Sequence, residues 1–183
     1  MKAADFLITY EGFAPRAIWD VNAWRIGYGS DTHTDATGAV RKVQQGDTTT
    51  PTDARRDLDR RISKEFIPKI INKIGADTWA AMPEGTRTAL ISIAYNYGNV
   101  PKQAIINAAR ARDLTTLAKV WTESTYNDNK KLPENVRNAL RKRRAKEAAL
   151  IAADAASTGA TGSNRTKIAA LAFILGGIAL LTQ

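Results

Sequence analysis

Apolar residues recur every three to four positions over most of this chain, a spacing typical of α-helices that bury one face. The pattern begins near the start of the chain, where Phe6, Leu7 and Tyr10 share one side of a predicted helix over 2–11. The later helices that this spacing predicts begin at Thr50 and cover 84–97, 101–111, 114–123 and 133–155. The protein is therefore predicted to be mainly α.

Residues 17–46 follow a different pattern, in which alternation and turn-forming residues replace the helical spacing. Segment 35–38 ends in Gly38, which suits a turn that needs a positive φ. Short strands are predicted over 17–19, 24–28 and 39–43. These strands predict a small antiparallel sheet beside the first helix.

The helix that begins at Thr50 carries signals for its start and for an irregularity. Thr50 is a suitable N-cap, and Pro51 fits the first turn, where a missing N–H removes no hydrogen bond. Pro68 lies inside the apolar pattern and predicts a kink or break there. The apolar positions of this helix are Leu58, Ile62, Phe66, Ile70 and Ile74.

The helix predicted over 84–97 is the most apolar part of the predicted domain, so we expect it to form the core. Asn96 lies near its end and is equally suited to a helix-end contact and to a substrate contact. The residues predicted to form the central core are Ala89, Leu90, Ile93 and Ala94.

The composition changes after residue 154. This change predicts a domain over 1–154, a flexible linker over 155–166 and an apolar tail over 167–183. Residues 168–181 are an uninterrupted apolar run if glycine is included, and a helix of that length rises about 21 Å, short of the roughly 30 Å hydrocarbon core of a bilayer. Three hypotheses stay open for the tail: a membrane anchor, a peptide that docks on a virion or membrane protein, or a helix that packs on its own domain.

The chain has 183 residues, a net charge of +9, one histidine and no cysteine. The absence of cysteine excludes disulfides and thiolate chemistry, and His33 stands alone in a polar loop, so we expect no metal site and no cofactor. The basic excess suits a polyanionic partner such as anionic lipid or an acidic bacterial wall. We expect no nucleic-acid partner, because the chain has no zinc-finger or RNA-binding strand motif.

Two carboxylates near the N-terminus supply candidate chemistry. Glu11 ends the first predicted helix among apolar residues, and Asp20 lies at the predicted hairpin beside Asn22. Glycoside cleavage needs one protonated carboxyl group, which donates to the leaving oxygen, and one charged carboxylate. Apolar neighbours favour the neutral form of a carboxyl group, and a polar turn favours the charged form. A helix-end acid and a turn acid also occur at this spacing by chance, so the pair alone does not establish a glycosidase.

Three motifs follow one another along the chain. The first joins Glu11-Gly12 and Asp20 to the run Ile26-Gly27-Tyr28-Gly29. The second is the helical segment 89–98, and the third runs from Leu132-Pro133 through Val136-Arg137 to residues 143–147. In this order they resemble the phage lysozymes, the muramidases of glycoside hydrolase family 24. The resemblance spans about residues 1–152 and implies a lysozyme-like α+β fold, a two-lobe domain with a small antiparallel β-hairpin lobe and a cleft between the lobes.

The resemblance implies cleavage of the β-1,4 bond between N-acetylmuramic acid and N-acetylglucosamine in peptidoglycan. Glu11 would be the general acid and Asp20 the charged partner. We expect further side chains to bind the sugars, with core packing an equal alternative for the three aromatic rings among them. These candidates are Trp19, Trp24, Tyr28 and Asn96.

One departure from the family lies just before the Ile-Gly-x-Gly run. Family members usually carry Thr there, and its hydroxyl helps to position the attacking water, whereas this chain has Arg25 one residue closer to the aspartate. Ser30, Asp31 or Thr32 could take that role. Alternatively, the protein is a lytic transglycosylase with Glu11 as its single catalytic acid, a wall-binding protein without catalysis, or one whose basic C-terminal part permeabilises membranes.

The N-terminal segment lacks the pattern of a signal peptide, because the apolar stretch over 6–10 is too short and runs directly into Glu11. The resemblance therefore implies a phage protein that is made in the host cytoplasm and acts at the host cell wall in the periplasm, in lysis or in virion entry. We expect peptidoglycan as one partner and, through the tail, a membrane or virion protein as another. The catalytic domain is expected to be monomeric.

Overall fold

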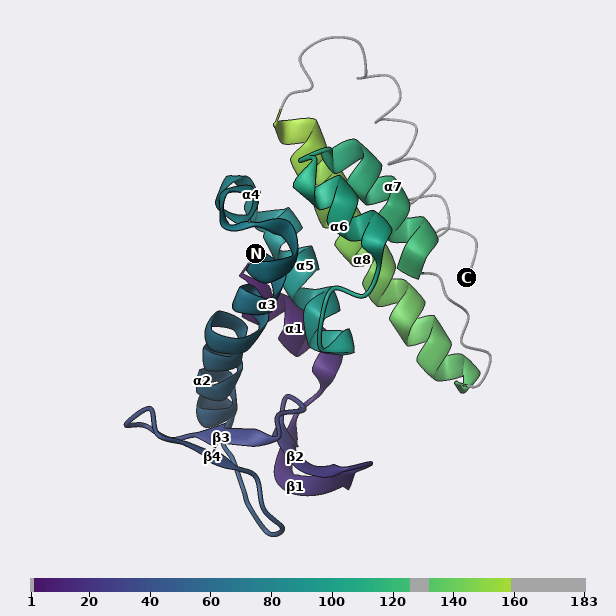
Figure 1. Ribbon diagram of the computed structural model, residues 1–183. Coiled ribbons are helices and arrows are strands. Elements are labelled where there is room, and N and C mark those ends of the chain that lie inside the picture. The colour runs from purple at the N-terminus through teal and green to yellow at the C-terminus, as the bar shows by residue number, and fades with distance from the viewer. Residues whose placement is uncertain (1, 126–131, 159–183) are drawn as a thin grey trace. The chain divides into compact units, whose positions relative to one another are not determined.

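The computed structural model describes residues 2–125 and 132–158, and the chain divides into two compact units over 1–69 and 70–183 (Figure 1). The first unit contains α1 (Ala3–Glu11), β1 (Ala14–Asp20), β2 (Ala23–Gly27), β3 (Thr32–Thr34), β4 (Val40–Lys42), α2 (Pro51–Arg61) and the π-helix η1 (Ile62–Phe66). Helix α3 (Ile67–Ile74) crosses the boundary, and the second unit continues with α4 (Ala76–Ala81), α5 (Glu84–Tyr97), α6 (Gln103–Arg110), α7 (Leu114–Thr125) and α8 (Glu134–Ser157). The predicted mainly helical class with a small antiparallel hairpin lobe is confirmed.

Strands β1 and β2 form an antiparallel hairpin whose loop has only two residues, Val21 and Asn22. Val21 has a φ of 53°, a backbone conformation that is unusual for a β-branched residue. Trp19 lies opposite Trp24 across the hairpin. Strand β1 extends the predicted segment 17–19, and β2 begins and ends one residue before the predicted segment 24–28. Strand β4 lies within the predicted segment 39–43, whereas its partner β3 was not predicted.

The Gly27-Tyr28-Gly29 run forms a turn, where a continuing strand was expected. Ile26 and Ser30 exchange two backbone hydrogen bonds across it, and Gly27 and Gly29 both have positive φ. A Cβ added at Gly27 would lie 2.6 Å from the Cβ of Ala54 on α2. Glycine at this position therefore provides both the turn and the close approach of β2 to α2.

The variant Gly27→Ala should lower the free energy of unfolding by about 2–4 kcal/mol, because it adds a steric clash to an unfavourable φ. Gly38→Ala is the matched control, since Gly38 has a φ of 88° and open space around its Cβ position. Urea unfolding of both variants separates the two costs. Equal losses would show that α2 yields to the added methyl group without penalty.

Helix α2 begins as predicted, with the side chain of Thr50 accepting a hydrogen bond from the Asp53 N–H and Pro51 in the first turn. The predicted kink or break near Pro68 takes the form of the π-helical turn η1, after which α3 continues to Ile74. At the end of η1 the Ile67 N–H donates to the Ile62 carbonyl. The wider turn precedes Pro68, the residue whose ring and missing N–H disturb a regular α-helix.

Helix α5 forms the core of the second unit, and α7 and α8 lie side by side within it (Figure 1). The core residues predicted on α5 are confirmed, since Ala89, Leu90, Ile93 and Ala94 have no exposed surface. The predicted helices 101–111, 114–123 and 133–155 correspond to α6, α7 and α8, whereas α4 was not predicted.

Helix α8 ends at Ser157, so the domain boundary predicted after residue 154 falls inside this helix. Asp154 accepts hydrogen bonds from the backbone N–H and the hydroxyl of Thr86, and Ala155 is buried. The remainder of the predicted linker and the apolar tail lie outside the described residues. Within the described part of the chain, no helix has the length and apolar character needed to cross a membrane.

Candidate active site

Glu11 is the last residue of α1 and is half-buried. Helix α1 buries Ala4, Phe6 and Leu7, which restricts the orientation of the helix. Gly12, with a φ of 65°, then ends the helix and turns the chain into β1. The packing of α1 therefore positions Glu11 directly before the hairpin.

Asp20 is the last residue of β1 and is exposed. Its Oδ2 accepts a hydrogen bond of 2.7 Å from Nε of Arg25, which lies on β2. Arg25 also extends one guanidinium nitrogen to the Gly29 carbonyl at 3.4 Å. The residue that replaces the usual threonine of the motif is thus an ion-pair partner of the candidate catalytic aspartate.

An open pocket of about 480 Å³ lies beside the hairpin. The rings of Trp19 and Trp24 meet edge to face at its side, with centroids 5.6 Å apart. Trp19 is 55 % exposed, so its ring remains available to a ligand. The residues that line the pocket are Trp19, Asn22, Ala23, Trp24, Arg25, Asp31, Lys42 and Val43.

Asp31 is the one carboxylate among the residues that line this pocket, which include neither Glu11 nor Asp20. Its Oδ2 accepts a 2.6 Å hydrogen bond from the Lys42 ammonium group, and Arg61 lies near its other oxygen. Partial burial alone would raise the pKa of Asp31, but the hydrogen bond and charge of Lys42, with the charge of Arg61, lower it below its usual value. Asp31 is therefore a charged group at neutral pH.

Ser30 and Thr32 direct their hydroxyl groups to Asp57 on α2, which is 2 % exposed. Thr34 and Arg60 donate to the same carboxylate. This buried network attaches the segment that follows the glycine turn to α2. Of the three residues considered for water positioning, Asp31 alone lines the pocket, while the hydroxyl groups of Ser30 and Thr32 are engaged by Asp57.

The other candidate substrate residues lie elsewhere. Tyr28 is buried, and its ring packs at 5.6 Å from that of Phe13. Asn96 is exposed on α5 in the second unit, where its side-chain oxygen accepts a 3.3 Å hydrogen bond from Arg144. The helix is terminated by Gly98, whose φ of 77° is left-handed, so Asn96 is not the C-cap residue.

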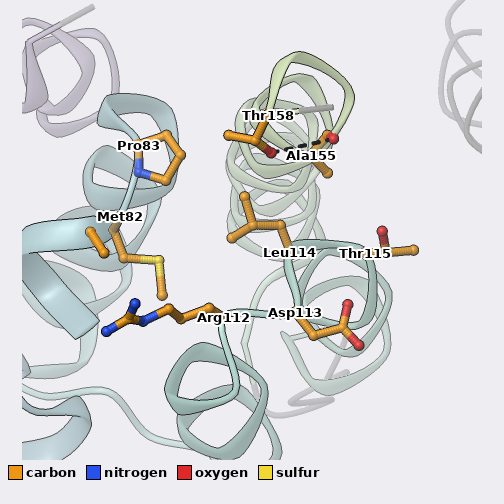
Figure 2. Close-up of a pocket in the computed structure, with 9 residues that line it drawn as sticks. Met82, Pro83, Arg112, Asp113, Leu114, Thr115, Ala155 and Thr158 are labelled. Carbon is orange, nitrogen blue, oxygen red and sulfur yellow. Dashed lines mark hydrogen bonds between the residues drawn. The ribbon is translucent and has the colours of Figure 1, made fainter. Parts of the chain in front are cut away.

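The second unit has a pocket of about 330 Å³ between the start of α7 and the end of α8 (Figure 2). Its single acid, Asp113, accepts hydrogen bonds from the backbone and hydroxyl of Thr116 and so caps α7. Arg112 and Met82 also line this pocket. None of the candidate catalytic residues lies there, and one capping carboxylate does not provide the acid pair of a glycosidase.

Comparison with protein families shows which family the chain belongs to. The family model described as phage lysozyme matches residues 8–147, which include both candidate carboxylates and the hairpin pocket. The chain belongs to the phage lysozyme family. This membership supports peptidoglycan-degrading lysozyme activity in general, that of a glycosidase acting on the bacterial cell wall. No curated protein matches the chain.

Two features of this phage lysozyme's site were not predicted from the sequence. The pairing of Arg25 with Asp20 follows from the register, because Asp20 lies opposite Ala23 and Arg25 opposite Ile18, which makes the two side chains diagonal neighbours. A hairpin loop of two residues, Val21 and Asn22, sets this register, so a prediction of that loop length would also have predicted the pairing. Asp57 has no comparable signal, since its partners on β3 and the preceding turn are more than 20 residues away in the sequence.

Proposed function

We propose that this phage lysozyme is a muramidase that cleaves the β-1,4 bond between N-acetylmuramic acid and N-acetylglucosamine, in host lysis or virion entry. The observation that carries the proposal is the family match over residues 8–147, which includes Glu11 and Asp20. Glu11 donates a proton to the leaving oxygen. Asp20 supplies the negative charge that stabilises the oxocarbenium-like centre.

The hairpin pocket serves as a sugar subsite in this proposal. Trp19 and Trp24 offer ring faces for sugar packing, and Asp31, Lys42 and Asn22 offer polar groups for hydroxyl and acetamido groups. The exposed Trp19 ring supports this role. The buried position of Tyr28 favours core packing for that ring.

Mass spectrometry of the muropeptides that the full-length protein releases from purified peptidoglycan tests the proposal. A muramidase leaves a reducing N-acetylmuramic acid end. Products cut at any other bond, or no products, would refute it.

A lytic transglycosylase is the second candidate, in which the sugar's own hydroxyl closes onto the anomeric carbon. The engagement of Ser30 and Thr32 by Asp57 favours it, because these hydroxyl groups are then less free to position water. The same mass spectra distinguish the two reactions, since an anhydro-muramic end lacks one water relative to the reducing end.

For the C-terminal tail we propose attachment to a membrane or to a virion protein. Truncation after Ser163 should leave cleavage of isolated peptidoglycan unchanged, because the family match ends at residue 147 and α8 ends at Ser157.

The full-length chain should float with liposomes, whereas the truncated chain should not, since each CH₂ group buried in the bilayer contributes about 0.8 kcal/mol. Full-length protein that remains monomeric in the soluble fraction would contradict the anchor.

A further inference from the structure

We propose that Arg25 is the positioning residue for Asp20 and that activity depends on this ion pair. The inference deepens the proposed function, on which it rests. It starts from a single contact: Nε of Arg25 donates to Oδ2 of Asp20 at 2.7 Å, within a hairpin whose register makes the two residues diagonal neighbours.

Asp20 needs an external partner to hold its carboxylate in one orientation. It ends β1 at a two-residue loop, its side chain is 56 % exposed, and the next residue, Val21, has a left-handed φ. Within the described residues, Arg25 is the only side chain that donates a hydrogen bond to Asp20. Without this bond the carboxylate would be free to change rotamer in solvent.

Arg25 is itself held by the turn that follows its own strand, β2. Its second contact is the Gly29 carbonyl in the glycine turn, and that turn is closed by the backbone hydrogen bonds between Ile26 and Ser30. The Ser30 hydroxyl in turn donates to the buried Asp57 carboxylate on α2. A continuous series of contacts therefore leads from helix α2 through the turn to the carboxylate of Asp20.

The contribution of this ion pair to stability is small. The two side chains are 33 % and 56 % exposed, and exposed ion pairs typically contribute about 0–1 kcal/mol. A catalytic carboxylate, however, must be held close to its productive geometry, and misplacement by about 1 Å can reduce the rate about 100-fold. The consequence of the pair is thus expected in catalysis rather than in folding.

A double-mutant cycle tests this role. The turnover number kcat and the Michaelis constant KM are measured on soluble glycan strands of peptidoglycan. The proteins compared are wild type, Arg25→Gln, Asp20→Asn and the double variant. Arg25→Gln should lower kcat about 10- to 100-fold and change KM less than about threefold. In the Asp20→Asn background, Arg25→Gln should have no further effect, because Arg25 acts through Asp20. Arg25→Lys should recover part of kcat, since it restores the charge without the planar guanidinium.

Arg41→Gln is the matched control. It removes an exposed arginine–aspartate pair of similar length, with Asp47, outside the hairpin pocket, and should leave kcat unchanged. Wild-type kcat in Arg25→Gln, or multiplicative losses in the double variant, would overturn the inference while leaving the proposed function intact. A wild-type protein that does not cleave the strands would overturn the proposed function and the inference together.

Discussion

Glu11→Gln should reduce wall cleavage by at least about 10²- to 10⁴-fold, the usual contribution of general acid catalysis. The amide has nearly the shape of the carboxyl group but has no proton to donate to the leaving oxygen. Loss of turbidity of chloroform-treated Gram-negative cells measures the rate. The fold should remain intact, because Glu11 is the half-buried last residue of α1 and the apolar face of that helix is unchanged.

Asp5→Asn is the control for this variant, since it makes the same carboxylate-to-amide change on the same helix. Asp5 is 51 % exposed and pairs with Arg55 on α2, away from the hairpin pocket. It should keep the wild-type rate. If Glu11→Gln also keeps that rate, the general acid is another group, and the identification of Glu11 is wrong.

The elements that the sequence predicted well are those whose signals are local. The start of α2 depends on a capping side chain and a proline within four residues, and both act as expected. The core of α5 follows from periodicity alone, because a fully apolar face has no alternative to burial. Such features depend on neighbouring residues, so they can be inferred without knowledge of the tertiary structure.

The parts of the site that could not be predicted depend on residues distant in sequence. Ser30 and Thr32 were considered for water positioning because of their place after the glycine run, but their hydroxyl groups bind Asp57, which lies 25 or more residues away on α2. The sequence pattern predicts a strand at Gly27, where the structure has a turn. The glycine is needed there because β2 approaches Ala54 on α2, a tertiary contact that the local pattern does not show. Local patterns therefore identified the candidate residues but not their partners.

Residues 143–147 belong to the third motif that resembles the phage lysozymes, and the sequence predicted no physical role for them. The structure shows that role. Glu147 has no exposed surface, and its carboxylate oxygens bind Ser92 on α5, Trp121 on α7, and the side chains of Arg143 and Arg144. Both arginines are at least 96 % buried with it. A single carboxylate thus connects three helices of the second unit.

Glu147→Ala should lower the free energy of unfolding by about 3–5 kcal/mol, because it leaves two buried guanidinium groups without their counter-ion. For a protein of this size, such a loss corresponds to a fall in melting temperature of about 10 °C. Calorimetry or circular dichroism measures it. Glu123→Ala is the control, since Glu123 is exposed on α7, and its change should stay within about 0.5 kcal/mol. A similar result for both variants would contradict the role assigned to Glu147.

Glu147→Gln isolates the charge and should show a pH dependence of defined sign. Burial raises the pKa of Glu147 above its usual 4.5, and Arg144, Ser92, Arg143 and Trp121 only partly oppose this. Because the folded-state pKa exceeds the unfolded one, the group stabilises the fold fully below about pH 4.5, and this contribution is lost as the pH rises through the raised value. The stability of wild type relative to Glu147→Gln should therefore decline as the pH rises above about 4.5, as urea unfolding at several pH values would measure. An increase with pH would mean that the two arginines outweigh burial and that the folded-state pKa of Glu147 is lowered.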